Sequence, residues 1–271
     1  MIPFRSAFSS ARITGVSRLA LAAALAAALG ACAQQPRPEV TGSIGGQPAQ
    51  MSDAEWRRQT DSLAARYQAE PKNTNVAIAY ARSLRASGQR AQAAAVLQQA
   101  SIRNPKDQTV LGAYGRALAD AGRFTEALDI LGKAHTPDQP DWRILNAQGA
   151  VLDQMGKNAE AQRYYQTALR MAPNDPGILS NLGLSYALSK DLVRAEETLR
   201  RAVADTNADP KVRQNLSVVL ALRSKFDEAE RVTNGVLPPD QARANVAYVR
   251  EMMRDQPARA KSTGARTASA S

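Results

Sequence analysis

The chain has 271 residues, a formal net charge of +10 and an aromatic content of only 5%. Few aromatic residues, together with abundant alanine and leucine, favour closely packed helices over a β-sandwich, so the composition predicts an all-α protein. The charge does not form a basic stripe of the kind that nucleic-acid-binding proteins carry, because residues 74–255 mix 24 Lys/Arg with 20 Asp/Glu. Nucleic acid is therefore not expected as a partner.

The N-terminus has the layout of a secretory signal. Arg5, Arg12 and Arg18 precede an apolar run over residues 19–29, which is too short for a membrane-spanning helix of about 20 residues. The run ends in "LGAC", and Leu29-Gly30-Ala31-Cys32 resembles the lipobox of bacterial lipoproteins. That resemblance implies that residues 1–31 are removed and that Cys32 carries lipid. The alternative is an incidental cysteine in an ordinary cleaved leader.

Cysteine usage favours the lipid interpretation. Cys32 is the only cysteine, so an exported chain has no internal disulfide partner for it. Residues 32–51 are rich in Pro, Gly, Gln and Ser, which predicts a flexible tether that reaches roughly 25 Å. Ala33 is not the Asp that signals inner-membrane retention in enterobacterial lipoproteins. The resemblance thus favours the outer membrane, facing the periplasm, and leaves the inner membrane open.

A capping helix is predicted over residues 52–73, where Ser52 and Glu55 form a capping-box pattern. After it, alanine recurs every 34 residues, in one column at positions 93, 127, 161, 195 and 229, and in a second column at 100, 134, 168 and 202. Glycine stands at 88, 122 and 156, and Lys190 and Ser224 take its place later. The period, with segments such as "NLGLSYALSKDLVRAEETLRRA", resembles the tetratricopeptide repeat, a helix–turn–helix unit.

The resemblance implies a right-handed α-solenoid of about five repeats with terminal capping helices. The predicted repeats are 74–107, 108–141, 142–175, 176–209 and 210–243. In repeats two, three and four, Gly115, Gly149 and Gly183 on the first helix (A) are expected to cross the alanine column on the second (B). The glycines at 88, 122 and 156 are expected in a left-handed conformation. That conformation costs Lys190 and Ser224 about 1 kcal/mol, so these two turns are predicted to differ.

The C-terminal end is predicted to close the stack. Pro238-Pro239 is expected to end the last B helix, and a capping helix follows over residues 240–255 with Asp240 as its N-cap. Val246, Val249 and Met253 fall on one face of this helix. Residues 256–271 lack large apolar side chains, which predicts a disordered tail.

No arrangement of residues indicates catalysis. The single histidine, His135, is predicted to be a solvated loop residue, and it has no cysteine or second histidine with which to bind metal. Asp138 and Asp141 flank Pro140, where aspartates are commoner as turn formers and N-caps than as cation ligands. No phosphate-binding or dinucleotide-binding motif is present. The sequence therefore predicts a protein that is not an enzyme, without metal or cofactor apart from the covalent lipid on Cys32.

The repeat resemblance implies a concave groove lined by positions 2, 5, 6, 9, 12 and 13 of helix A. These positions place Arg82, Arg85, Arg116, Arg143, Asn146, Asn181, Lys211 and Asn215 in the groove. Asn181 and Asn215 share position 6, where such proteins use asparagine to bind a peptide backbone. The family's carboxylate-clamp pattern is absent. Two alternatives stay open: the arginines form a solvated face, and Leu184, Leu188, Val218 and Leu222 pack against the terminal helix instead of a partner.

A repeat-containing lipoprotein with a Pro/Gly-rich tether is similar to the assembly lipoproteins of the Flp/Tad pilus system. The resemblance implies a membrane-tethered, non-catalytic scaffold that binds protein partners through the groove, with the secretin or other pilus-assembly components as the expected partners. The alternative is a periplasmic adaptor that docks a cell-wall hydrolase or protease onto its substrates. Both hypotheses require a protein-binding surface on the A helices.

Overall fold

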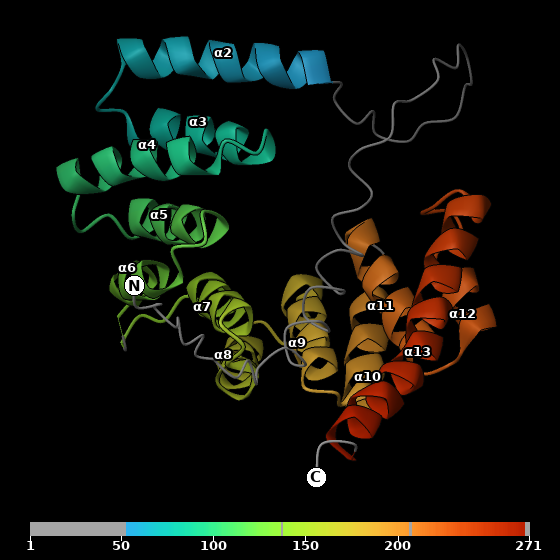
Figure 1. Ribbon diagram of the computed structural model, residues 1–271. Coiled ribbons are helices and arrows are strands. Elements are labelled where there is room, and N and C mark those ends of the chain that lie inside the picture. The colour runs from blue at the N-terminus through green and yellow to red at the C-terminus, as the bar shows by residue number, and fades with distance from the viewer. Residues whose placement is uncertain (1–52, 137, 206–207, 269–271) are drawn as a thin grey trace, which may run out of the picture. The chain divides into compact units, whose positions relative to one another are not determined.

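The structure, a computed structural model, describes residues 53–136, 138–205 and 208–268 (Figure 1). Within these ranges it contains helices and no strand. The helices, in chain order, are α2 (Asp53–Ala69), α3 (Thr74–Ala86), α4 (Arg90–Arg103), α5 (Gln108–Asp120), α6 (Phe124–Lys133), α7 (Trp142–Gln154), α8 (Asn158–Met171), α9 (Pro176–Leu188), α10 (Leu192–Val203), α11 (Pro210–Leu222), α12 (Phe226–Arg231) and α13 (Pro239–Ala268).

The helices pair as the 34-residue period predicts. Each predicted repeat contains one A helix (α3, α5, α7, α9 or α11) and one B helix (α4, α6, α8, α10 or α12). The two helices of a pair contact each other, each B helix from α4 to α10 contacts the next A helix, and neighbouring A helices also touch. The predicted fold class, an all-α tetratricopeptide solenoid, is confirmed.

Every A helix begins at the same kind of cap. The N-cap residues are Asn73, Asp107, Asp141, Asp175 and Asp209, and each side chain accepts a hydrogen bond from a backbone N–H of the first turn. Such a cap stabilises a helix by typically about 1 kcal/mol. Because the caps recur every 34 residues, the last residue of one repeat starts the first helix of the next.

Every A helix also ends in the same turn. Gly88, Gly122 and Gly156 have φ of 77°, 77° and 75°, and Lys190 and Ser224 adopt 65° and 62°. In all five turns, the N–H of the following residue donates to a carbonyl five residues back, as in Asp191 N–H to Tyr186 O at 2.9 Å. Lys190 and Ser224 thus make the same hydrogen-bonded turn as the glycines, with a slightly smaller φ. The backbone at both residues adopts the left-handed conformation although neither is glycine.

The helix crossings depend on small residues. The five alanines of the first column have no exposed surface, and the four of the second are at most 3% exposed. A Cβ built on Gly115, Gly149 or Gly183 would lie 2.5–2.6 Å from Leu131, Tyr165 or Leu199 of the paired B helix. These distances are shorter than carbon–carbon contacts allow, so only glycine permits this approach.

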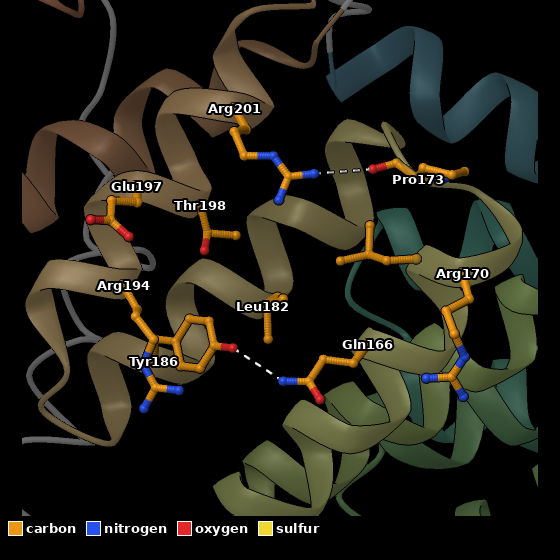
Figure 2. Close-up of a pocket in the computed structure, with 10 residues that line it drawn as sticks. Gln166, Arg170, Pro173, Leu182, Tyr186, Arg194, Glu197, Thr198 and Arg201 are labelled. Atoms are coloured by element: carbon orange, nitrogen blue, oxygen red, sulfur yellow. Dashed lines mark hydrogen bonds between the residues drawn. The ribbon is translucent and has the colours of Figure 1, made fainter.

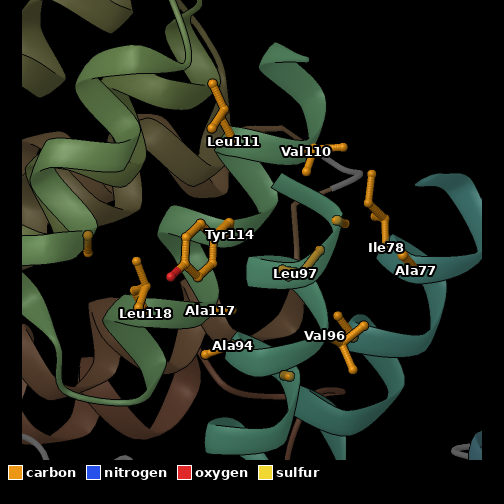
Figure 3. Close-up of a cluster of buried hydrophobic side chains, with 14 of the residues drawn as sticks. Ala77, Ile78, Ala94, Val96, Leu97, Val110, Leu111, Tyr114, Ala117 and Leu118 are labelled. Carbon is orange, nitrogen blue, oxygen red and sulfur yellow. The ribbon is translucent and has the colours of Figure 1, made fainter. Parts of the chain in front are cut away.

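The core follows the stack as a series of layers between adjacent helices. Figure 3 shows part of the first cluster, in which Ile78 of α3, Leu97 of α4 and Tyr114 of α5 share one buried layer. A second cluster contains Tyr165 and Leu199 and reaches Val246 of α13. Each layer is built by neighbouring repeats, as expected for a solenoid.

At the N-terminal end, α2 covers the first repeat. Leu63, Ala64 and Tyr67 pack against the first core cluster, and the Tyr67 ring lies 5.7 Å from the ring of Tyr80. The predicted capping-box residue Ser52 lies outside the described residues.

The fifth repeat departs from the pattern. Its B helix, α12, ends at Arg231, well before Pro238, and Gly235 follows with a φ of 76°. The segment Val232-Thr233-Asn234-Gly235 consists of β-branched residues, asparagine and glycine, all weak helix formers, which explains the early end. The predicted stop at Pro238-Pro239 is wrong. Pro239 instead begins α13, and Asp240 lies in the first turn of that helix.

The terminal helix α13 packs against α11 and α12. Val246 and Val249 are each 3% exposed, and Met253 packs against the same cluster, so the predicted apolar face is buried. The helix continues to Ala268 and thereby includes residues 256–268, for which the sequence predicts disorder.

The predicted leader (1–31), lipid site and tether (32–51) lie outside the described residues. Of the helices that the structure describes, none combines the length and the apolar character that crossing a bilayer requires.

Candidate protein-binding surface

The predicted groove residues lie on successive A helices, and we call this surface the A-helix face. Its N-terminal half carries Arg82 and Arg85 on α3, Arg116 on α5 and Arg143 on α7. Arg82 and Arg143 are exposed, whereas Arg116 is half-buried. Arg85 forms an ion pair with Asp120 of α5. A carboxylate of the next repeat therefore balances the positive charge of Arg85.

Arg116 lies at the centre of this arginine group. Its guanidinium donates to the backbone carbonyl of Arg143 at 3.3 Å, and no ion pair joins it to a carboxylate among the described residues. Burial, and the positive charges of Arg85, Arg82 and Arg143, lower its pKa, while Asp141 opposes the effect. An arginine stays protonated at any physiological pH, so the unfavourable charge persists. An anionic group bound here would relieve it.

The C-terminal half of the A-helix face carries an amide ladder. Asn181 on α9 donates to the side-chain oxygen of Asn146 on α7 at 3.0 Å. One repeat further, Asn215 on α11 donates to the hydroxyl of Ser180 on α9 at 2.9 Å. In both bonds, position 6 of one A helix contacts position 5 of the A helix before it. The ladder therefore joins repeats three, four and five.

The two asparagines differ in exposure. Asn181 is half-buried, but Asn215 is only 7% exposed, so the expectation that Asn215 faces an open groove is wrong. Its side-chain oxygen is buried without a hydrogen-bond partner among the described residues. Its amide is held against α9 by the bond to Ser180. Lys211, at the start of the same helix, is exposed.

The structure also addresses the apolar residues of repeats four and five. Leu184, Leu188 and Val218 are half-buried. Leu222 packs into the cluster that contains Val246 and Val249 of α13. Whether Leu222 contacts the terminal helix or a partner stays a prediction.

Buried acidic groups in the described residues have structural partners. Asp153 accepts hydrogen bonds from Tyr165 (2.9 Å), Asn158 (2.7 Å) and Ser185 (2.7 Å), and burial raises its pKa. Ser185 belongs to the next repeat, so Asp153 joins repeats three and four. No group of three or more His, Cys, Asp or Glu side chains suited to a metal occurs in the described part of the chain.

The loop between repeats two and three differs in part from expectation. Asp141 is the N-cap of α7, as its position suggests, and Asp138 is exposed. His135 is half-buried, and its Nδ1 is buried without a hydrogen-bond partner among the described residues, so the prediction of a solvated histidine is wrong. It follows Ala134, the buried C-cap residue of α6.

Sequence reasoning missed a cleft of about 440 Å³ between α8, α9 and α10 (Figure 2). We call it the B-helix cleft; it is lined by Gln166, Leu169, Arg170, Pro173, Leu182, Tyr186, Arg194, Glu197, Thr198 and Arg201. A signal for it exists in the repeat alignment. Arg194 occupies a position where repeats two, three and five have Glu126, Glu160 and Glu228.

The family comparison agrees with the repeat period. Residues 84–149 and 146–210 each match a family model described as tetratricopeptide repeat. The chain therefore contains tetratricopeptide repeats, and the matched residues run from the end of α3 through α10. No curated protein matches the sequence.

Several solved structures share the fold. The Cut9–Hcn1 hetero-tetramer of APC/C matches with a TM-score of 0.60 and 16% identity, over 74% of this chain and 40% of that chain. The human IFIT1 dimer with PPP-AAAA matches at 0.55 and 16%, over 68% and 47%. Pseudomonas aeruginosa pilF matches at 0.50 and 19%, over 66% and 82%. The protein covers less than half the length of the first two of these chains. At these identities the likeness shows the fold alone.

Proposed function

We propose that the protein is a non-catalytic scaffold, anchored in the bacterial envelope by lipid on Cys32, that assists assembly of an Flp/Tad pilus. The observation that best supports a binding role is the arginine group on the A-helix face. Four arginines from three consecutive repeats lie together, and one of them is half-buried among like charges. A fold that needed only to be stable would not require this arrangement, since like charges brought together are unfavourable.

The anchor supports a location at the membrane. The short apolar run that ends at Cys32 fits a lipoprotein signal, and stable membrane attachment takes at least two lipid chains. Residue Ala33 favours the outer membrane, with the solenoid in the periplasm. The proposed partners are the secretin or other pilus-assembly components, because a tethered repeat scaffold suits a large envelope assembly.

Lipidation is tested by metabolic labelling with a clickable palmitate. The wild-type chain should incorporate label and fractionate with membranes, whereas Cys32→Ser should do neither. Equal labelling of both chains would show that Cys32 does not carry the lipid.

The partner is tested by crosslinking and affinity capture from membranes, with wild type compared with an Arg82→Gln/Arg116→Gln variant. We expect secretin or pilus-assembly components in the wild-type capture, reduced about tenfold or more in the variant, because hydrogen bonds to charged groups are worth about 1.5–3 kcal/mol. Arg103→Gln, which removes a charge from α4 away from this face, is the matched control. Capture of a peptidase or cell-wall hydrolase instead would favour the adaptor hypothesis.

A further inference from the structure

The B-helix cleft combines an apolar floor with a basic rim. Leu169, Leu182 and the ring of Tyr186 form the floor, and the Thr198 side chain points into the space beside them (Figure 2). Gln166 donates to the Tyr186 hydroxyl at 3.2 Å across one side. A volume of about 440 Å³ lies within the range of ligand sites, roughly 300–1,000 Å³.

Three arginines stand at the rim, against one acidic residue, Glu197. Arg170 donates to the Thr167 hydroxyl at 3.0 Å, and Arg201 donates to the Pro173 carbonyl at 3.4 Å. Within the described ranges, neither arginine forms an ion pair with a carboxylate. Both keep guanidinium N–H donors that face solvent. The planar guanidinium matches the two oxygens of a carboxylate, so the rim is suited to acidic groups.

The third arginine, Arg194, takes a position that is acidic in repeats two, three and five. In repeat two, Arg123 pairs with Glu126 at 2.5 Å, and in repeat four, Asp191 pairs with Arg194 at 2.5 Å. The two ion pairs occupy the same register with opposite polarity, and only Asp191 also caps its helix, by accepting a hydrogen bond from the backbone N–H of Arg194. In repeat four, the residue of this ion pair that lines the cleft is the arginine, Arg194. Its guanidinium lies 4.5 Å from the centre of the Tyr186 ring.

Exposed apolar side chains adjoin the cleft in the chain. Met171 follows Arg170 and is 42% exposed, and Val193 precedes Arg194 and is 51% exposed. They are two of the four large apolar residues recorded as exposed in the described ranges. Arginine is enriched at protein interfaces, where other charged residues are depleted.

From these observations we propose that the B-helix cleft is a second protein-binding site, which takes an acidic segment of a partner with one apolar side chain between carboxylates. The apolar side chain fills the floor over Leu182 and Tyr186. The flanking carboxylates pair with Arg170 and Arg201. This site lies between the B helices of repeats three and four, apart from the A-helix face, and lets one scaffold hold two partner segments at once.

The test uses the full-length chain in detergent and a fluorescein-labelled peptide in which four glutamates flank one phenylalanine. Fluorescence polarisation should show saturable binding to wild type. Arg170→Gln/Arg201→Gln should weaken it at least about tenfold, as expected for loss of charge-assisted hydrogen bonds. Replacing the peptide's phenylalanine by alanine should also weaken binding.

Two variants serve as controls. Arg103 donates to the Pro71 carbonyl at 2.8 Å, a bond of the same kind as the one that Arg201 makes to Pro173. Arg103→Gln thus removes the same charge and the same kind of bond elsewhere, and binding should stay unchanged. Arg82→Gln/Arg116→Gln on the A-helix face should also leave it unchanged, which separates this site from the proposed groove function.

Four results would overturn the proposal. The first is that Arg170→Gln/Arg201→Gln binds the peptide as tightly as wild type, and the second is that Arg103→Gln loses as much affinity as that variant. The third is that only the A-helix-face variant loses affinity. The fourth is that wild type binds the alanine peptide as tightly as the phenylalanine peptide. A single-stranded oligonucleotide or an anionic lipid vesicle that binds more tightly than the peptide, with the same arginine dependence, would assign the cleft to phosphate rather than to a protein segment.

Discussion

Glu196 on α10 is a buried carboxylate that receives its hydrogen bonds from two repeats. Its side chain is 6% exposed and lies 2.7 Å from Arg200, one turn further along α10, and 2.8 Å from Lys225, which precedes α12. Arg223, at the end of α11, pairs with its other oxygen. Burial alone would raise the pKa of Glu196, but hydrogen bonds from Lys225 and Arg200 and the nearby positive charges lower it to about 2.

This lowered pKa predicts that the contact between repeats four and five stabilises the protein to a degree that depends on pH. Because the folded pKa lies below the unfolded value of about 4.3, Glu196 stabilises the fold above that value, and its contribution disappears as pH falls towards 2. Its partners are partly exposed, so we expect about 1–3 kcal/mol. Unfolding free energies measured between pH 2 and 7 should show a shallower slope for Glu196→Gln than for wild type. Parallel curves would contradict this role.

The amide ladder predicts unequal effects for its two asparagines. Asn215→Ala removes a buried hydrogen bond and leaves the Ser180 hydroxyl without it, so the free energy of unfolding should fall by about 1–3 kcal/mol. Asn181→Ala should cost less, because Asn181 is half-buried and water can replace the lost bond to Asn146. Thermal unfolding of the two variants measures the difference. A larger loss of stability for Asn181→Ala than for Asn215→Ala would show that the burial of each asparagine does not determine its contribution.

At the scale of the helix and its turn, two side chains occupy a conformation that suits glycine. Lys190 and Ser224 have φ of 65° and 62°, a region that costs non-glycine residues about 1 kcal/mol or more. Lys190→Gly and Ser224→Gly should therefore each raise the free energy of unfolding by about 0.5–1 kcal/mol, since part of the gain is offset by the freer unfolded chain. Denaturant unfolding measures the change.

The neighbouring residue supplies the control for that experiment. Ser189 has an ordinary φ of −81°, so Ser189→Gly should destabilise the protein. If it stabilises as much as Lys190→Gly, the effect does not come from the left-handed conformation.

Most of the elements could be predicted from the sequence because their determinants are local and periodic. The alanines at 93, 127 and 161 predict the helix crossings, since small side chains at a fixed spacing have one common use. The length of α12 could not be obtained in this way. It depends on Val232 and Gly235, which interrupt a pattern that the four preceding repeats had established.

At the scale of the whole molecule, the candidate binding surfaces were harder to predict than the fold. Position within a repeat places Arg116 and Asn215 on the same face, but Asn215 is buried and bonded to Ser180 of the preceding A helix. The B-helix cleft arises from side chains of two repeats, so it becomes visible only when Arg170 and Arg194 are seen together. The sequence specifies each repeat, whereas the sites are properties of the junctions between repeats.

The terminal helix predicts a graded response to truncation. A chain that ends at Pro238 lacks α13 and exposes the part of α11 that Val246 and Val249 cover. Because repeats are stabilised by their nearest neighbours, amide hydrogen exchange should accelerate in α11 and α12 and stay unchanged in α3 and α5. A chain that ends at Arg254 keeps the buried face of α13 and is the control. Equal acceleration along the whole stack would contradict nearest-neighbour coupling.

The 34-residue column of N-caps has a consequence for changes in the number of repeats. If residues 108–141 were excised, Asp107 would precede Trp142 and could cap α7 in place of Asp141, and the turns and alanine columns would stay in phase. The backbone thus tolerates a shorter or longer array. The excision would nevertheless delete Arg116, and with it the centre of the arginine group. Gain or loss of a whole repeat therefore preserves the fold but changes the residues that are available to bind partners.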